Sequence, residues 1–110
     1  MSQFNTQVLP TQSKDDFDRA VDLAAAQLRL GEVVAVPTET VYGLAGNALS
    51  GAAVRKIFEI KGRPQSNPLI VHVADWLMVE QCVLDWDTGA SQLAKAFWPG
   101  PLTIVVRKSH

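Results

Sequence analysis

Residues 33–44 read VVAVPTETVYGL, an apolar run that stops at Pro37 and continues into a short polar segment. The β-branched run before the proline predicts a buried β-strand. The segment after it presents two hydroxyls, a carboxylate and a phenol, from Thr38, Glu39, Thr40 and Tyr42. An ordinary connecting loop is richer in glycine, asparagine and aspartate, and open α/β sheets bind ligands beyond the carboxyl ends of their strands. We therefore interpret this segment as a candidate binding site.

The composition of the 110 residues is that of a single globular domain, with 47% hydrophobic and 19% charged residues. A net charge of -1 and a pI near 6.0 give no overall attraction for nucleic acid or an anionic membrane. The single cysteine, Cys82, excludes an internal disulfide and fits a reducing compartment. No signal-peptide pattern opens the sequence, and no apolar stretch approaches the roughly 20 residues of a membrane span. A cytoplasmic protein is therefore expected.

Two helices are predicted, one on each side of the polar segment. Residues 13–31 begin with Ser13 as N-cap and end at Gly31, a typical position for a C-cap glycine. Residues 51–62 form the second helix, which Gly62 and Pro64 close. The apolar residues at helical spacing, expected to face inward, are Phe17, Ala20, Val21, Ala24 and Leu28 in the first helix and Val54, Ile57 and Phe58 in the second.

Four further segments complete the predicted fold. Residues 75–84 and 88–97 have helical patterns, while 69–73 (LIVHV) and 102–106 (LTIVV) are apolar runs typical of buried strands. Together with the first strand, they predict a sheet covered by helices on both faces. The expected fold class is α/β, with three layers around a twisted, mixed or largely parallel sheet.

The expected domain organisation is an N-terminal extension, residues 1–12, followed by one domain from residue 13 to residue 110. The last predicted strand, 102–106, has no covering element after it, which would leave an exposed sheet edge. We expect these residues to be the front part of a larger domain. A small protein that dimerises is the alternative.

Several common catalytic motifs are absent from the sequence. The glycines match neither the P-loop pattern G-x-x-x-x-G-K-[ST] nor the dinucleotide pattern G-x-G-x-x-G. With two histidines, His72 and His110, a multi-histidine metal site is not expected. No serine lies in a nucleophile elbow. The sequence therefore predicts neither a standard phosphate loop nor covalent catalysis.

A second polar segment, KGRPQSNPLIVHV, spans residues 61–73. Lys61 and Arg63 flank a glycine at the predicted helix end, where the helix dipole favours cations by roughly 0.3–1 kcal/mol. Two prolines also stiffen the chain around Ser66 and Asn67. A rigid loop with two cations, a hydroxyl and an amide suits a phosphate and a ribose or base. His72 is predicted on the strand face opposite its apolar neighbours, either as a half-exposed residue or as a ligand contact.

A third segment, WPGPLT at residues 98–103, predicts a rigid turn that leads into the last strand and includes Thr103. Simple turn chemistry explains it as well as a binding role does. Trp76, Trp86 and Trp98 are expected to pack in the core or at its rim. Arg55, Lys56, Lys61 and Arg63 form a weak basic cluster without interleaved aromatic residues.

In this order and spacing, PTETVYGL, KGRPQSNPL and WPGPLT resemble the YrdC-like family of threonylcarbamoyl-adenylate synthases. The resemblance extends from about Ser13 to Arg107 and implies a twisted mixed sheet flanked by helices. It implies that L-threonine, bicarbonate and ATP react to threonylcarbamoyl-adenylate and pyrophosphate. Mg²⁺ is implied as well, without dedicated protein ligands. Typical members continue for about as long again, so these residues correspond to the N-terminal part of the domain.

The resemblance also implies roles for individual residues. Thr40 and His72 would bind threonine, and Arg63 and Asn67 would bind ATP. Lys61 and Arg63 would be catalytic, because a carbamate oxygen attacks the α-phosphate and both reactants are anions. Candidate residues of the pocket wall are Thr38, Tyr42, Ser66 and Thr103.

The expected product feeds the modification of an adenosine beside the anticodon of certain tRNAs, which a separate transferase complex completes. Direct tRNA binding and membrane binding are not indicated. Two other functions remain open. One is a nucleic-acid-binding module, such as one for double-stranded RNA, that uses the basic cluster. The other is the carbamoyltransferase-type YrdC-like domain of hydrogenase maturation, which uses carbamoyl phosphate.

Overall fold

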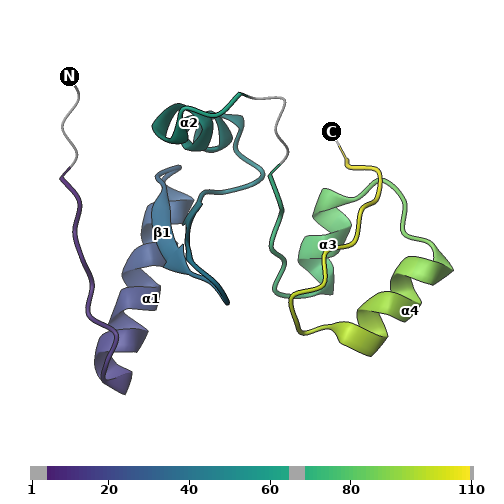
Figure 1. Ribbon diagram of the computed structural model, residues 1–110, viewed down its shortest axis with the longest axis horizontal. Helices are drawn as coiled ribbons and strands as arrows, with labels where there is room; N and C mark the ends of the chain where they lie inside the picture. The colour runs from purple at the N-terminus through teal and green to yellow at the C-terminus, as the bar shows by residue number, and fades with distance from the viewer. Residues whose placement is uncertain (1–4, 65–68, 110) are drawn as a thin grey trace. The chain divides into compact units, whose positions relative to one another are not determined.

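A computed structural model describes residues 5–64 and 69–109. The chain forms two compact units, Met1–Pro64 and Gln65–His110. Figure 1 labels α1, β1 and α2 in the first unit, and α3 and α4 in the second. Each unit is described by itself below.

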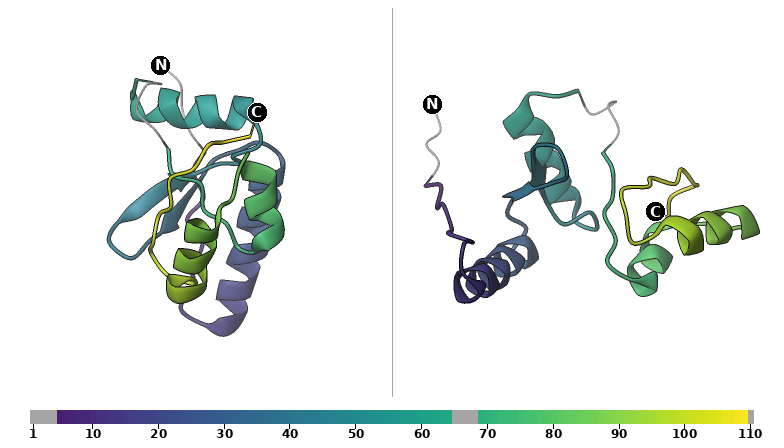
Figure 2. Two further views of the ribbon diagram at one scale, coloured as in Figure 1. Left: turned by 90° about the vertical axis from the view of Figure 1, so that its right-hand side faces the viewer. Right: turned by 60° about the horizontal axis from the view of Figure 1, so that its bottom comes forward.

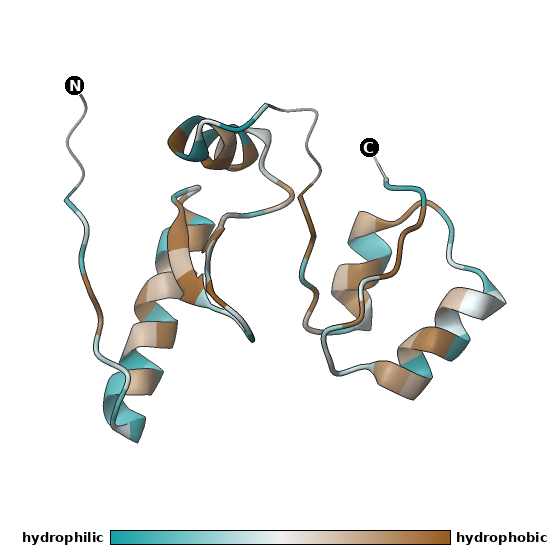
Figure 3. Cartoon of the chain, in the orientation of Figure 1, coloured by the Kyte–Doolittle hydropathy of each residue, from teal (hydrophilic) through white to brown (hydrophobic). Residues whose placement is uncertain are grey.

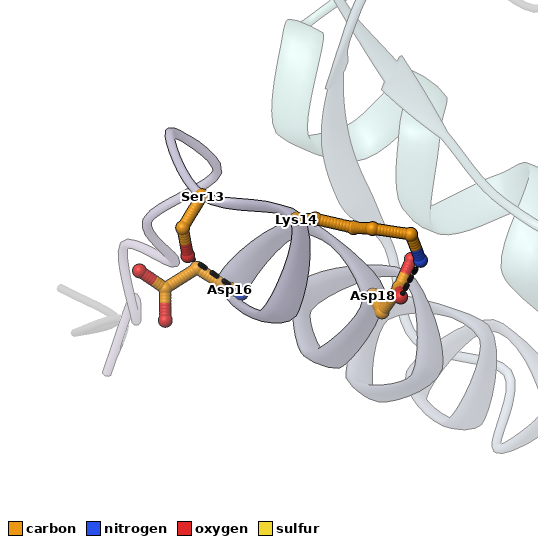
Figure 4. A network of polar contacts seen from close by, with 4 residues as sticks. All are labelled: Ser13, Lys14, Asp16 and Asp18. Atoms are coloured by element: carbon orange, nitrogen blue, oxygen red, sulfur yellow. Dashed lines mark hydrogen bonds and ion pairs between the residues drawn. The ribbon is translucent and has the colours of Figure 1, made fainter.

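The first helix, α1 (Lys14–Arg29), begins where the sequence predicts. The Ser13 hydroxyl accepts a hydrogen bond from the Asp16 backbone N–H at 3.0 Å, which satisfies one of the free N–H groups at the helix start. Lys14 and Asp18 form an exposed ion pair of 2.8 Å along the same turn (Figure 4). The predicted N-cap is confirmed.

The predicted inward face of α1 is confirmed only in part. Ala20 is buried, and Ala24 and Leu28 are half-buried. Phe17 and Val21, however, keep 51% and 49% of their surface exposed. The helical spacing thus predicts the correct face of α1. The described residues bury only part of that face, because burial depends on which elements pack against the helix.

The polar segment lies in a β-hairpin. Strand β1 (Val34–Pro37) pairs antiparallel with β2 (Tyr42–Ala45), with Val36 opposite Gly43 and Pro37 opposite Tyr42. The predicted strand before the polar segment is confirmed, but its predicted burial is not, because β1 alternates between half-buried and exposed residues. The sequence pattern gave no sign of β2, whose residues lack a run of β-branched side chains. The polar residues are therefore a hairpin turn, not the free end of a strand in a parallel sheet.

The second helix, α2 (Gly51–Lys61), packs against the residue that follows β2 and runs crosswise to α1 (Figures 1 and 2). Its buried residues are Ala53, Ile57 and Phe58. A Cβ on Gly46 would lie 3.1 Å from the Ile57 Cδ1 atom, so a side chain here would require Ile57 to shift slightly. The predicted helix is confirmed, and of its predicted inward residues Ile57 and Phe58 are buried while Val54 is half-buried.

Lys56 links α2 to the turn between α1 and β1. Its ammonium donates a hydrogen bond to the Gly31 carbonyl at 3.3 Å and forms an ion pair of 3.2 Å with Glu32. Both partners lie in the glycine turn that ends α1. This cation of the predicted basic cluster therefore has a structural role.

In the second unit, α3 (Trp76–Cys82) and α4 (Thr88–Phe97) confirm both predicted helices. Each begins at an aspartate N-cap that accepts a hydrogen bond from a backbone N–H, 2.9 Å for Asp75 and 2.7 Å for Asp87. Local side-chain capping explains why these boundaries are readable from the sequence.

The three tryptophans, predicted in the core or at its rim, pack against one another, with Trp86 and Trp98 half-buried and Trp76 50% exposed. The Trp86 ring lies 5.4 Å from Trp76, edge to face, and 6.0 Å from Trp98. The Trp98 indole donates a hydrogen bond to the Leu102 carbonyl at 2.9 Å and so closes the WPGPLT turn. This segment therefore has at least the structural role that turn chemistry predicts.

The two strands predicted at residues 69–73 and 102–106 are wrong for this structure, because neither segment is a β-strand. Both remain strongly apolar (Figure 3), and burial alternates along the second, with Val105 92% exposed. A strand needs a neighbour that accepts its backbone hydrogen bonds. Near these segments the described residues supply one antiparallel bridge, between Val83 and Lys108.

The fold class is thus mixed α/β, with four helices and a two-stranded sheet in the described part of the chain. The three-layer arrangement is not present among these residues. In the same part of the chain, no helix is both long enough and apolar enough to cross a membrane.

Candidate functional site

The hairpin turn presents the first group of predicted site residues. The Thr38 N–H donates a hydrogen bond to the Val41 carbonyl at 3.2 Å, and the Thr38 hydroxyl donates to the same oxygen. The hydroxyl also accepts a hydrogen bond from the Val41 N–H at 3.3 Å. Thr38, predicted to line the pocket wall, therefore has its hydroxyl engaged in closing the turn.

Every side chain from Thr38 to Tyr42, the first residue of β2, is exposed, and Thr40 and Tyr42 are the other two predicted site residues among them. Tyr42 keeps 75% of its surface exposed, and Thr40 is also exposed. Within residues 5–64 and 69–109, the Thr40 hydroxyl has no hydrogen-bonding partner. The turn therefore presents one hydroxyl and one phenol that are available to a ligand.

We expect Thr38→Val to loosen this turn, because valine keeps the shape but removes both side-chain hydrogen bonds. The free energy of unfolding should fall by about 1 kcal/mol, measured by urea denaturation of the full natural chain. Thr38→Ser should retain most of the stability, because serine keeps the hydroxyl. Equal stability of all three proteins would show that these bonds contribute nothing.

The end of α2 presents the second group of site residues. Lys61 is its last residue, and Gly62 follows in the left-handed conformation, with φ 65°. The Gly62 N–H donates a hydrogen bond to the Glu59 carbonyl at 3.3 Å, and the Arg63 N–H donates to the Phe58 carbonyl at 3.1 Å. These two bonds form a Schellman motif, so the helix end fixes the backbone of Arg63.

The two cations of this group are not committed elsewhere in the described residues. Lys61 is exposed and Arg63 half-buried, and neither forms an ion pair with a described carboxylate. Lys56, by contrast, is paired with Glu32. The part of the chain that the structure describes thus leaves Lys61 and Arg63 able to bind an anion.

The remaining predicted residues belong to the second unit. His72 and Thr103 are exposed, His72 outside any strand and Thr103 after the WPGPLT turn. Ser66 and Asn67 lie outside the described residues. The structure therefore brings together Thr38, Thr40 and Tyr42 in one turn and Lys61 and Arg63 at one helix end.

Two features of the site went unnoticed in the sequence. The main chain of Val41 accepts and donates the bonds that shape the turn, and backbone groups carry no residue-type signal. Gly62 was read only as a helix end, although it also sets the backbone of Arg63.

Among the described residues, no group of three or more histidine, cysteine, aspartate or glutamate side chains could hold a metal ion.

Among the described residues, a hairpin turn carries a hydroxyl without a hydrogen-bonding partner, and a helix end carries two cations without an ion-pair partner. Groups of this kind in a mixed α/β chain can bind a small polar anion. The model of the Sua5, YciO and YrdC family, described by the words telomere recombination, matches residues 26–110. The chain belongs to this family.

Several curated relatives are named threonylcarbamoyl-AMP synthase. The Pyrococcus abyssi protein is 53% identical over 90 residues, which make up 82% of this chain and 26% of that protein. The Bacillus subtilis protein is also 53% identical, over 89 residues, with 81% of this chain and 26% of the relative covered. The human protein is 43% identical over 94 residues, with 83% and 32% covered.

The solved structure of P. abyssi Sua5 complexed with L-threonine resembles this chain with a TM-score of 0.79 and 51% identity. The match covers 84% of this chain and 27% of that chain. The chain thus spans about a quarter of the length of the archaeal and Bacillus relatives. What the whole relatives do is attributed to this protein only as a proposal.

Proposed function

We propose that the protein carrying these residues is an L-threonylcarbamoyladenylate synthase. It would form threonylcarbamoyl-AMP and pyrophosphate from L-threonine, bicarbonate and ATP, for the threonylcarbamoyladenosine modification of tRNA. The observation that carries this proposal is the 53% identity over 90 residues to a relative named threonylcarbamoyl-AMP synthase. That identity supports a shared reaction, because it spans the chain that bears the candidate site.

The proposed roles divide between the two substrates. Thr40 and His72 would contact L-threonine, the amino acid present in the solved complex of P. abyssi Sua5. Lys61, Arg63 and Asn67 would contact ATP. Tyr42, Ser66 and Thr103 would line the pocket, and Thr38 would do so as part of the turn.

For the whole protein, we propose a three-layer domain with a twisted mixed sheet flanked by helices. The mixed α/β fold of the described residues, which resembles part of the P. abyssi Sua5 structure, supports this proposal. Residues 1–12 would be an extension, and residues 13–110 would form the N-terminal part of the domain. The reaction would take place in the cytoplasm, where the downstream transferase complex modifies tRNA.

The chemistry requires two anions to meet. The threonine amine adds to the carbon of CO₂, formed from bicarbonate, and loses a proton, which gives a carbamate. A carbamate oxygen then bonds to the α-phosphorus of ATP, and the bond to the β,γ-pyrophosphate breaks. Lys61 and Arg63 would hold the phosphates against the repulsion of the carbamate and stabilise the charge on the leaving group. Mg²⁺ accompanying ATP would supply further positive charge.

We expect the full natural chain to release pyrophosphate from ATP only when L-threonine and bicarbonate are both present. A coupled pyrophosphate assay measures this, with reactions that lack one substrate as controls. L-serine should react more slowly, because it lacks the methyl group, a difference of about 1–3 kcal/mol in transition-state binding. Pyrophosphate release at an equal rate without any amino acid would contradict the proposal.

A further inference from the structure

Both helices of the first unit end in the same backbone motif. At the end of α1, Gly31 has φ 84°, and the N–H groups of Gly31 and Glu32 donate to carbonyls of the last turn at 3.1 and 3.0 Å. At the end of α2, Gly62 has φ 65°, and the N–H groups of Gly62 and Arg63 donate in the same pattern at 3.3 and 3.1 Å. The two glycines are therefore a natural matched pair.

The residues that the two motifs hold are different. After Gly31 the chain places Glu32, which pairs with Lys56. After Gly62 it places Arg63, which has no ion-pair partner within the described ranges 5–64 and 69–109. Lys61 stands on the other side of Gly62. The second motif therefore sets the separation and direction of two available cations.

We propose that Gly62 is a positioning residue for the phosphate contacts of Arg63 and Lys61, an inference that rests on the proposed function. Gly62 has no side chain, so this role would be exerted through its backbone conformation. Its left-handed backbone turns the chain so that Arg63 leaves the helix end at a fixed angle while its N–H stays bonded to the Phe58 carbonyl. A planar guanidinium fork binds phosphate oxygens with two parallel bonds and tolerates little misalignment.

A methyl group at either glycine would act through the backbone conformation and not through a steric clash. A Cβ at Gly31 or at Gly62 would meet no atom within 4 Å. Alanine at either position therefore creates no clash, but it disfavours the left-handed conformation. Asparagine adopts that conformation more readily than other residues with a side chain.

The experiment compares Gly62→Ala, Gly31→Ala and Gly62→Asn in the full natural chain. Melting temperatures should fall to a similar extent in the two alanine variants. The dissociation constant of ATP, measured by calorimetry, should rise about tenfold or more for Gly62→Ala. A small displacement of a binding group is enough for such a loss, because it misaligns the group with the phosphate oxygens. Gly31→Ala should bind ATP as the wild type does, and Gly62→Asn should recover most of the affinity. L-threonine binding should be unchanged in all three.

The outcomes separate this inference from the proposed function. Equal losses of ATP affinity in Gly62→Ala and Gly31→Ala would overturn the positioning role, since both would then act through stability alone. Full ATP affinity in Gly62→Ala would overturn it as well. If the wild type binds ATP but shows no threonine-dependent pyrophosphate release, the proposed function fails, while the ATP comparison still decides the role of Gly62.

Discussion

Replacing Arg63 by alanine in the full natural chain is expected to lower kcat/KM for ATP by about 100-fold or more, the range seen when one charge-stabilising donor is removed. Arg63 follows the Schellman motif of α2 and lacks a carboxylate partner in the part of the chain that the structure describes. Its guanidinium is therefore free to bind phosphate. Removal of the fork should affect both ATP binding and the stabilisation of the leaving pyrophosphate.

Two further variants make this test specific. Arg63→Lys should recover only part of the activity, because an ammonium is a point charge without the planar fork. Arg55→Ala removes an exposed arginine within α2 and should leave kcat/KM for ATP near the wild-type value. If Arg63→Ala also kept full activity, the cation at this helix end would act only through the helix dipole, worth roughly 0.3–1 kcal/mol of stability.

Residues 1–110 produced alone are expected to have no measurable synthase activity and to be poorly folded or oligomeric. The buried hydrophobic residues among those described are few and mostly small, namely Ala20, Ala53, Ile57, Phe58, Val79 and Ala90. Large apolar side chains remain on the surface, including Val105 at 92% and Ile70 at 63% exposure. Apolar segments that are exposed in this way pair with other chains.

Size-exclusion chromatography with light scattering and a pyrophosphate-release assay test this prediction, with the full natural chain as the control. The piece should elute as oligomers or aggregate, while the control releases pyrophosphate. Weak threonine binding by the piece is compatible with the expectation, since Thr40 and His72 both lie within it. A monomeric piece with full activity would show that residues 1–110 hold a complete site.

Helix boundaries were predictable from the sequence because their signals are local. Ser13 lies three residues before the N–H that it caps. Gly62 stands directly after α2, and Gly31 stands two residues after the end of α1. Helix capping depends on hydrogen bonds between residues that are close together in the chain, so the residue types at these positions predict it. The helical period of α2 similarly predicted Ile57 and Phe58 as buried.

Strands were predicted less well because pairing is not local. Residues 69–73 and 102–106 have the composition of strands but lack pairing partners among the described residues, apart from the bridge beside the second segment. The pair β1–β2 forms instead, although Tyr42–Ala45 has no strong strand pattern, because the Thr38–Val41 turn brings it back against β1. An apolar, β-branched composition allows a segment to join a sheet, but the segment becomes a strand only when a neighbouring segment pairs with it.

By itself, the sequence determined the helices, their caps and the residue types of the candidate site, because these depend on neighbours in the chain and on side-chain chemistry. Only the folded structure shows that the Thr38 hydroxyl bonds to Val41, three residues along the chain, while the Thr40 hydroxyl has no partner among the described residues. It also decided that Lys56 is held by Glu32, whereas Arg63 is not paired with a described carboxylate. The physical reason is that a side chain's availability depends on which partners the fold brings within hydrogen-bonding distance.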